Sequence, residues 1–299
     1  AAAEDMAADL VIDASGRRSR APRWLDELGV RPAKEERLDA RLAYATRLYR
    51  FAQEPDAAVN VTSTPACPRG GVLMPVEHGR WLLTLSGFGG ESPATDEDAF
   101  LDHAARLTHP YLRDLMRTAQ PLSPVFGFAD TSNRRRRYDE KGAAPDGFLA
   151  VGDALCAFNP LYGQGMAVAA AHALAVRTTL ARRPVGAGFS TDAQRAVSRK
   201  SALPWLYTTS ADRPYLAPSG SRARGLDRLA YWYTDRLIDH VAVDNTVGEA
   251  LRGVFGLALP PTRVLSPTVT LRTLRRPRPS LADPPTSPVG PVLGGGVPS

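Results

Sequence analysis

The chain has 299 residues, of which 43% are hydrophobic and 23% charged, a balance typical of a soluble globular protein of about two domains. Its two cysteines, Cys67 and Cys156, make neither a disulfide framework nor a metal-ligand spacing, which favours a reducing, cytoplasmic setting without a metal site. The net charge of +6 comes from dispersed arginines and no apolar run is long enough to span a bilayer, so nucleic-acid binding and stable membrane insertion are both disfavoured.

The first thirty residues predict one strand and one short helix. Residues 8–14 (ADLVIDA) form an apolar run that ends in Asp13-Ala14 and passes into Ser15-Gly16. Pro22–Gly29 predicts a helix with Pro at its start and Gly as its stop. The chain has no initiator Met and no Gly-x-Gly-x-x-Gly between a strand and a helix, so we expect it to be the C-terminal part of a longer protein.

Residues 31–145 predict an antiparallel sheet. Short, partly alternating runs rich in β-branched and aromatic residues predict its strands, and Glu77–Gly79 predicts a hairpin turn. Thr95 predicts a helix cap. Arg134–Arg137 predicts a strand with solvated or paired arginines, because no aromatic platform for nucleic acid accompanies it. The expected strands are Leu42–Arg50, Val59–Thr64, Gly71–Val76, Arg80–Ser86, Pro124–Ala129 and Asn133–Tyr138.

The stretch 147–175 carries the clearest chemical signal. Phe148–Val151 predicts a buried strand that runs into Gly152-Asp153, and an Ala-rich helix follows the loop Asn159–Gly165. A carboxylate there can accept hydroxyl hydrogen bonds, and glycines allow close backbone approach. A helix N-terminus adds free N–H groups and partial positive charge. This arrangement is typical of a site for a polyhydroxylated, phosphorylated cofactor.

Two motifs resemble those of a known superfamily. Gly152-Asp153-Ala154 together with residues 159–166 (NPLYGQGM) resembles the second flavin-binding motif of FAD-dependent monooxygenases of the aromatic-hydroxylase type. Ala14-Ser15-Gly16 resembles the Ala-Thr-Gly motif that closes the dinucleotide-binding domain in the same superfamily, although Ser15 stands where the hydroxylases have an Asp linked to NADPH and FAD binding.

The resemblance implies an α/β fold with an inserted α+β part. A partial, Rossmann-like FAD-binding domain would comprise residues 1–30 and 146–185, and an antiparallel-sheet substrate domain residues 31–145. A helical region, 186–274, and a disordered tail, 275–299, would follow. In the helical region, residues 226–259 show helical spacing, and His240 is expected on a helix surface.

The resemblance also implies the cofactor site. FAD would be reduced by NAD(P)H and would use O₂ to hydroxylate or epoxidise a small apolar, aromatic or polyketide- or terpenoid-like molecule. Asp153 would bind the ribityl or pyrophosphate part of FAD. We assign no catalytic acid or base, since the flavin carries the chemistry and the five histidines are scattered. The predicted cofactor-binding residues are Asp13, Ala14, Ser15, Gly16, Gly152, Asp153, Asn159, Pro160, Gly163, Gln164, Gly165 and Met166.

Three alternatives stay open. A reductase of isoprenoid double bonds shares the implied fold. A flavin-dependent halogenase does too, although Gly71–Pro75 lacks both tryptophans of that family's signature. From another class, the chain would be a non-catalytic remnant that binds a hydrophobic ligand, and we expect the chain alone to retain little FAD.

Overall fold

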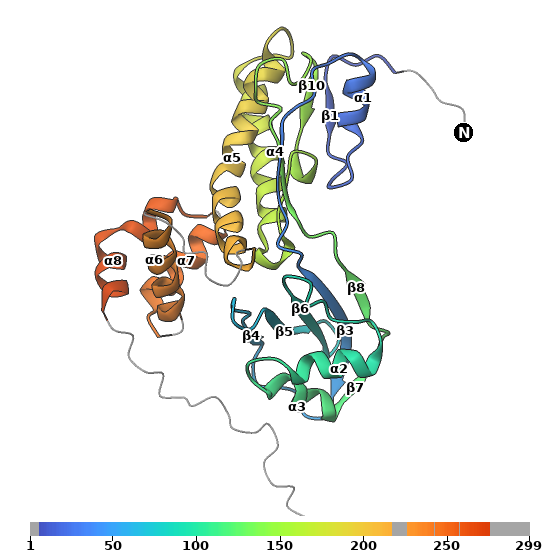
Figure 1. Ribbon diagram of the computed structural model, residues 1–299. Helices are drawn as coiled ribbons and strands as arrows, with labels where there is room; N and C mark the ends of the chain where they lie inside the picture. Colours follow the sequence, from blue (N-terminus) through green and yellow to red (C-terminus); the bar gives the residue numbers. More distant parts are fainter. Residues whose placement is uncertain (1–5, 217–225, 242, 257, 276–299) are drawn as a thin grey trace, which may run out of the picture. The chain divides into compact units, whose positions relative to one another are not determined.

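In the computed structural model, the described residues are 6–216, 226–241, 243–256 and 258–275. Their contacts form two units, residues 6–39 with the described residues between 131 and 275, and residues 40–130 (Figure 1). This second unit covers fewer residues than the predicted substrate domain, which comprised 31–145. The segments on either side of it belong to the first unit, because their strands pair with each other. The predicted disordered tail, except for Arg275, lies outside the described residues.

The first unit holds two small sheets and most of the helices. One sheet pairs β1 (Val11–Asp13) with β10 (Phe148–Ala150) in parallel. The other is antiparallel, in the order β11 (Cys156–Ala157), β9 (Asn133–Arg136), β2 (Glu35–Leu38). The helical elements are α1 (Ala21–Glu27), η1 (Gly152–Ala154), η2 (Pro160–Tyr162), α4 (Gln164–Arg182), α5 (Phe189–Asp212), η3 (Arg213–Tyr215), α6 (Leu226–Val241), α7 (Asn245–Phe255), η4 (Pro261–Leu265) and α8 (Pro267–Leu274).

Two apolar cores organise this unit. α4 and α5 lie side by side (Figure 1), and residues of both pack with Leu149 of β10 around Phe158 and Phe189. The helices α6, α7 and α8 share a smaller core that includes Leu237 and Val247. Within the described residues, no helix has the length and apolar character needed to cross a bilayer.

The second unit is a six-stranded antiparallel sheet with helices on one face. The sheet order is β4-β5-β6-β3-β7, and β8 also pairs with β3. Burial alternates along β3, so that Ala45 and Tyr49 pack with Leu83 against Phe100 and Leu112 of the helices. The elements are β3 (Ala43–Phe51), β4 (Val59–Val61), β5 (Arg69–Val76), β6 (Arg80–Gly87), α2 (Glu97–Ala105), α3 (Tyr111–Thr118), β7 (Ala119–Pro121) and β8 (Phe126–Phe128).

The hairpin predicted at Glu77–Gly79 joins β5 to β6, and His78 and Gly79 both have positive φ there. The predicted cap Thr95 is wrong by one residue. Asp96 caps α2 instead, because its carboxylate accepts the N–H of Ala99 at 3.0 Å.

The run Arg134–Arg137 is a paired strand, as predicted, but the sheet to which it was assigned is wrong. In β9, Arg135 and Arg136 face Glu36 and Glu35 of β2, and the ion pairs measure 2.6 Å and 3.1 Å. Opposite charges across an antiparallel pair stabilise this register. The complementary charges therefore place the strand in the first unit rather than in the six-stranded sheet.

The expectation of a surface His240 is also wrong. Its side chain is buried, and its ring nitrogens lie 2.6 Å from the carbonyl oxygen of Arg236 and 3.1 Å from that of Arg275. The chain just after α8 returns against α6 at this point, which a residue pattern local to α6 does not reveal.

We predict that Gly87→Ala lowers the free energy of unfolding of the second unit by about 3 kcal/mol or more. A Cβ on Gly87 would lie 1.6 Å from the backbone oxygen of Glu91, so backbone must move. Urea unfolding followed by circular dichroism measures the change. Gly186→Ala is the matched control, because a Cβ there meets nothing within 4 Å. Equal midpoints for the two variants would contradict this packing.

Candidate functional site

The carboxyl ends of β1 and β10 lie at the same edge of the parallel sheet. Asp13, the last residue of β1, pairs in register with Ala150, the last residue of β10. The predicted segments Ala14–Gly16 and Gly152–Asp153 therefore leave the sheet next to each other. Ligand-binding loops of open α/β sheets occupy this edge.

Asp13 organises the first of these loops. Its side chain is 7% exposed, and its carboxylate accepts the N–H of Ser15 at 3.0 Å, the hydroxyl of Ser15 at 2.5 Å and the hydroxyl of Ser19. Burial raises the pKa of Asp13, but these hydrogen bonds outweigh it and leave the pKa below its ordinary value. The carboxylate thus shapes the turn that leads to Gly16, whose φ is +84°.

A hollow of about 620 Å³ opens beside this loop. Asp13, Ala14 and Ser15 line it together with apolar side chains that include Trp24 and Leu28, which are 48% and 75% exposed. Its volume lies in the range of pockets that hold small molecules and cofactors.

Gly152 and His172 fix the second loop. Gly152 has a φ of +56°, and its N–H donates to Nδ1 of His172 at 2.9 Å. Since Nδ1 accepts, Nε2 carries the ring proton and donates to the hydroxyl of Ser201, also at 2.9 Å. Burial lowers the pKa of His172 to about 4, so the ring is neutral near pH 7. A neutral imidazole therefore connects α5 to the Gly-Asp turn.

Asp153 differs from Asp13 in having no hydrogen-bond partner among the residues that the structure describes. Its carboxylate is half-buried and accepts no hydrogen bond from the described part of the chain. Burial raises its pKa, and Arg17 and Arg134 offset part of that rise. Its Oδ1 lies 3.7 Å from where a Cβ on Gly165 would stand. A carboxylate with free acceptor positions therefore lies beside the first turn of α4.

The N-terminus of α4 has no side-chain cap. Gly163 precedes the helix with a φ of +65°, and the first turn contains no acidic residue. The N–H groups of a first helical turn have no partners within the helix and carry partial positive charge. Leu161 and Met166 beside it are 47% and 87% exposed. The N-terminus of α4 can therefore bind an electron-rich group, and the exposed apolar side chains of Leu161 and Met166 lie beside it.

A second buried carboxylate, Asp212, holds the loop before α4. It is 1% exposed and accepts hydrogen bonds from Asn133 at 2.6 Å, from Asn159 at 3.0 and 3.1 Å, and from the hydroxyl of Tyr162 at 2.6 Å. Burial raises the pKa of Asp212, and the three donors oppose that rise. Asn133 also accepts the N–H of Asn159, and Asn159 accepts that of Leu161. β9, η2 and the end of α5 therefore share one network.

Gln164 completes the attachment of the loop. It is 4% exposed, and its Nε2 donates to the carbonyl oxygen of Tyr162 at 3.3 Å and to that of Phe255 at 2.9 Å. The second bond joins the start of α4 to the end of α7.

The predicted site residues thus divide into three groups, all in the first unit. Asp13, Asn159 and the side-chain nitrogen of Gln164 make hydrogen bonds within the protein, whereas Asp153, Pro160 and Met166 present free acceptor positions or exposed surface. The six others form the backbone turns between them: Ala14, Ser15, Gly16, Gly152, Gly163 and Gly165. Within the described ranges, no cluster of three His, Cys, Asp or Glu side chains could hold a metal ion.

Several residues of this edge were missed by the sequence motifs. Asp212 and His172 are two, and Arg17 is a third, donating to the carbonyl oxygens of Ser132 and Phe158 at 2.6 Å each. All three act over separations of at least 20 residues, and no local pattern marks them.

No protein-family model matches the chain. Over 213 residues it is 30% identical to Protein Rv3254 of Mycobacterium tuberculosis, an alignment that covers 70% of this chain and 45% of that protein. The chain therefore spans less than half the length of this curated relative.

Solved structures share the fold. The anhydrotetracycline hydroxylase OxyS from Streptomyces rimosus has a TM-score of 0.53 at 15% identity, over 83% of this chain and 46% of its own. The flavin-dependent halogenase CmlS scores 0.54 at 15% identity, over 77% and 44%. Klebsiella pneumoniae HpxO, solved with FAD and uric acid, scores 0.51 at 16%, over 76% and 55%. The chain thus has the mixed α/β fold of flavin-dependent hydroxylases and halogenases.

We predict that Asp212→Ala lowers the free energy of unfolding by about 3 kcal/mol or more, because three buried donors lose their acceptor. Urea unfolding gives the value. Asp192→Ala, on the same helix, removes a carboxylate whose side chain is 52% exposed, and should cost less than about 1 kcal/mol. Similar losses in the two variants would show that the Asp212 network does not stabilise the fold.

We also predict a pH dependence that originates at His172. Its pKa is about 4 in the folded protein against 6.5 ordinarily, so between these values the unfolded chain binds a proton that the folded chain does not. Stability is therefore full above pH 6.5 and falls as the pH drops, by about 2 kcal/mol between pH 7 and pH 5. His172→Gln keeps an acceptor for Gly152 and should lack this contribution. Urea unfolding at both pH values tests the prediction. If the free energy of unfolding changes equally between pH 7 and pH 5 in the two proteins, a neutral, buried His172 is excluded.

Proposed function

We propose that the protein binds FAD at the edge formed by β1, β10 and the start of α4, and acts as an FAD-dependent monooxygenase. One observation carries the proposal: the carboxylate of Asp153 has free acceptor positions and lies beside an uncapped helix N-terminus that follows the left-handed Gly163. Such a combination suits a ligand with both hydroxyl groups and electron-rich or anionic groups.

The residues present fit such a cofactor. Asp153 would accept hydrogen bonds from its polyol or ribose hydroxyls. The backbone of Gly163–Met166 would meet the electron-rich edge of its ring, where positive helix-end charge stabilises negative charge that develops in a reaction. The hollow beside Ala14 and Ser15 provides further volume of the right order. Bound FAD would supply the redox chemistry with NAD(P)H and O₂, and the protein's part would be to bind, orient and exclude water.

The six-stranded sheet supports a substrate role for the second unit. α2 and α3 cover one of its faces. On the opposite face, the rings of Tyr44 and Phe128 lie 5.4 Å apart, and Phe126 is 61% exposed. These aromatic side chains suit a small apolar or aromatic substrate, which would be hydroxylated or epoxidised.

A flavin-dependent halogenase is the second candidate, because CmlS shares the fold as closely as the hydroxylase OxyS does. We prefer the monooxygenase because Gly71–Pro75 lacks the tryptophans of the halogenase signature. Halide-dependent product formation would identify a halogenase. An isoprenoid reductase would oxidise NAD(P)H without consuming O₂.

Titration of FAD into the purified chain tests the proposal. We expect weak but saturable binding of added FAD, in keeping with the little FAD that the chain alone should retain, detected by the visible absorbance and fluorescence of the flavin. The dissociation constant should be about ten-fold higher for Asp153→Ala, because hydrogen bonds to a charged acceptor are lost.

Asp98→Ala is the matched control, since this exposed carboxylate belongs to α2 in the other unit. Its dissociation constant should equal that of the unaltered protein. No saturable binding, or the same affinity for all three proteins, would refute an FAD site at Asp153.

A further inference from the structure

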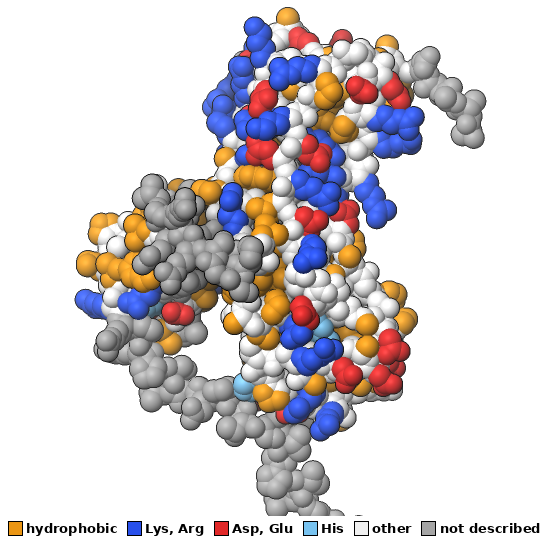
Figure 2. All heavy atoms as spheres, viewed as in Figure 1, with side chains coloured by type: hydrophobic (Ala, Val, Ile, Leu, Met, Phe, Trp, Pro, Cys, Tyr) orange, Lys and Arg blue, Asp and Glu red, His pale blue; other side chains and the backbone are white. Residues whose placement is uncertain are grey.

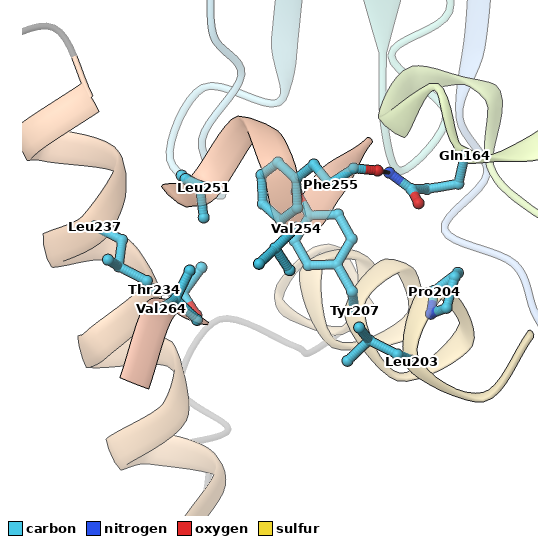
Figure 3. A pocket seen from close by; sticks show the side chains of 10 residues that line it. All are labelled: Gln164, Leu203, Pro204, Tyr207, Thr234, Leu237, Leu251, Val254, Phe255 and Val264. Carbon is cyan, nitrogen blue, oxygen red and sulfur yellow. Dashed lines mark hydrogen bonds between the residues drawn. The ribbon is translucent and has the colours of Figure 1, made fainter. Parts of the chain in front are cut away.

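A separate cavity of about 170 Å³ lies in the first unit, between the start of α4, the second half of α5 and the C-terminal helices (Figure 3). Its walls are almost entirely apolar. Tyr207 of α5 and Phe255 of α7 contribute aromatic rings whose centroids are 4.4 Å apart. Leu203, Leu237, Leu251 and Val254 add aliphatic surface.

Gln164 provides a hydrogen-bond acceptor at one end of this cavity. Both of its donor bonds go to carbonyl oxygens, those of Tyr162 and Phe255, which orients the amide nitrogen toward α7 (Figure 3). The side-chain oxygen Oε1 accepts no hydrogen bond from the residues that the structure describes, although Gln164 is only 4% exposed. This oxygen is therefore open to a ligand with one hydrogen-bond donor, and the apolar walls around it favour a ligand that is otherwise apolar.

Size and polarity together define the ligand. An apolar cavity of about 150 Å³ stays dry and takes up a molecule the size of benzene. The cavity here is slightly larger and adds one acceptor. We propose that it binds a neutral single-ring aromatic molecule with one hydroxyl group, of the phenol class. Its ring packs against Tyr207 and Phe255, and its hydroxyl donates to Oε1 of Gln164.

This site is separate from the proposed substrate face and shares with the proposed FAD site only Gln164, at the start of α4. Its lining residues come from α4–α7 and η4 of the first unit, whereas the aromatic face assigned to the substrate belongs to the second unit. Among the predicted cofactor residues, only Gln164 takes part. Binding of a phenol requires no flavin, so success or failure of this inference is independent of the proposed function.

Isothermal titration calorimetry of the purified chain with phenol and with benzene tests the site. We expect both to bind at one saturable site. Gln164→Leu should raise the dissociation constant of phenol about ten-fold or more, because the hydroxyl loses its acceptor, and change that of benzene by less than about two-fold. Equal weakening of the two ligands would overturn the role of Gln164.

Val254→Phe should abolish binding of both ligands, because the added ring fills the cavity, while Val243→Phe makes the same change on exposed surface outside it. Circular dichroism checks that each variant folds. If Val254→Phe does not fold, Leu203→Trp fills the cavity from α5. No saturable binding by the unaltered chain, or unchanged affinity in a folded cavity-filling variant, would refute the site.

Discussion

The buried carboxylate of Asp212 is the interaction on which the arrangement of the first unit depends. It is almost fully removed from solvent at the end of α5, without a salt bridge to a cationic side chain in the described residues, and three neutral donors satisfy it. A carboxylate buried in this way is tolerated only while all of its donors stay in place. Those donors come from β9 and from the loop before α4, so one side chain determines where the loop 159–163 stands relative to the sheet and the helices.

The same reasoning separates the residues that build the site from those that can bind a ligand. Asp13 and Asn159 belong to motifs that resemble flavin-binding sequences, yet their polar atoms are occupied by Ser15, Ser19, Asp212 and the backbone. Asp153, by contrast, has raised pKa and free acceptor positions. The turns made by the first group hold Asp153 and the N-terminus of α4 in position. Motif membership therefore does not distinguish a ligand contact from the support behind it, whereas hydrogen-bond saturation does.

Charge and apolar patterning distribute the rest of the chain between the two units. The acidic β2 and the basic β9 pair through complementary charges. This pairing places both strands in the first unit, which also contains the parallel sheet. In the six-stranded sheet, alternating burial places one face against α2 and α3 (Figure 1) and leaves aromatic rings on the other. On the face shown in Figure 2, many charged side chains lie on the part of the first unit that contains α1 and β10, whereas hydrophobic side chains gather on the C-terminal helices. The proposed FAD site lies at the turns that follow β1 and β10, and the separate cavity lies between the apolar faces of helices.

The sequence by itself determined many of the elements, because strand and helix signals are local. The hairpin at Glu77–Gly79, the strand that begins at Phe148 and the helix from Gln164 all follow from neighbouring residues, whereas β2, β7 and β11 were not predicted. The mixed α/β class followed from the resemblance of the two motifs, at residues 14–16 and 152–166, to flavin-binding sequences. Only the tertiary structure decided that β9 joins β2, that His240 is buried against the chain after α8, and that Asp212 and His172 support the loops. Each of these contacts joins residues from different elements, apart from a single helix-local bond of His240. The energies of these contacts depend on partners that no local pattern specifies, because burial and hydrogen bonding depend on how distant parts of the chain pack together.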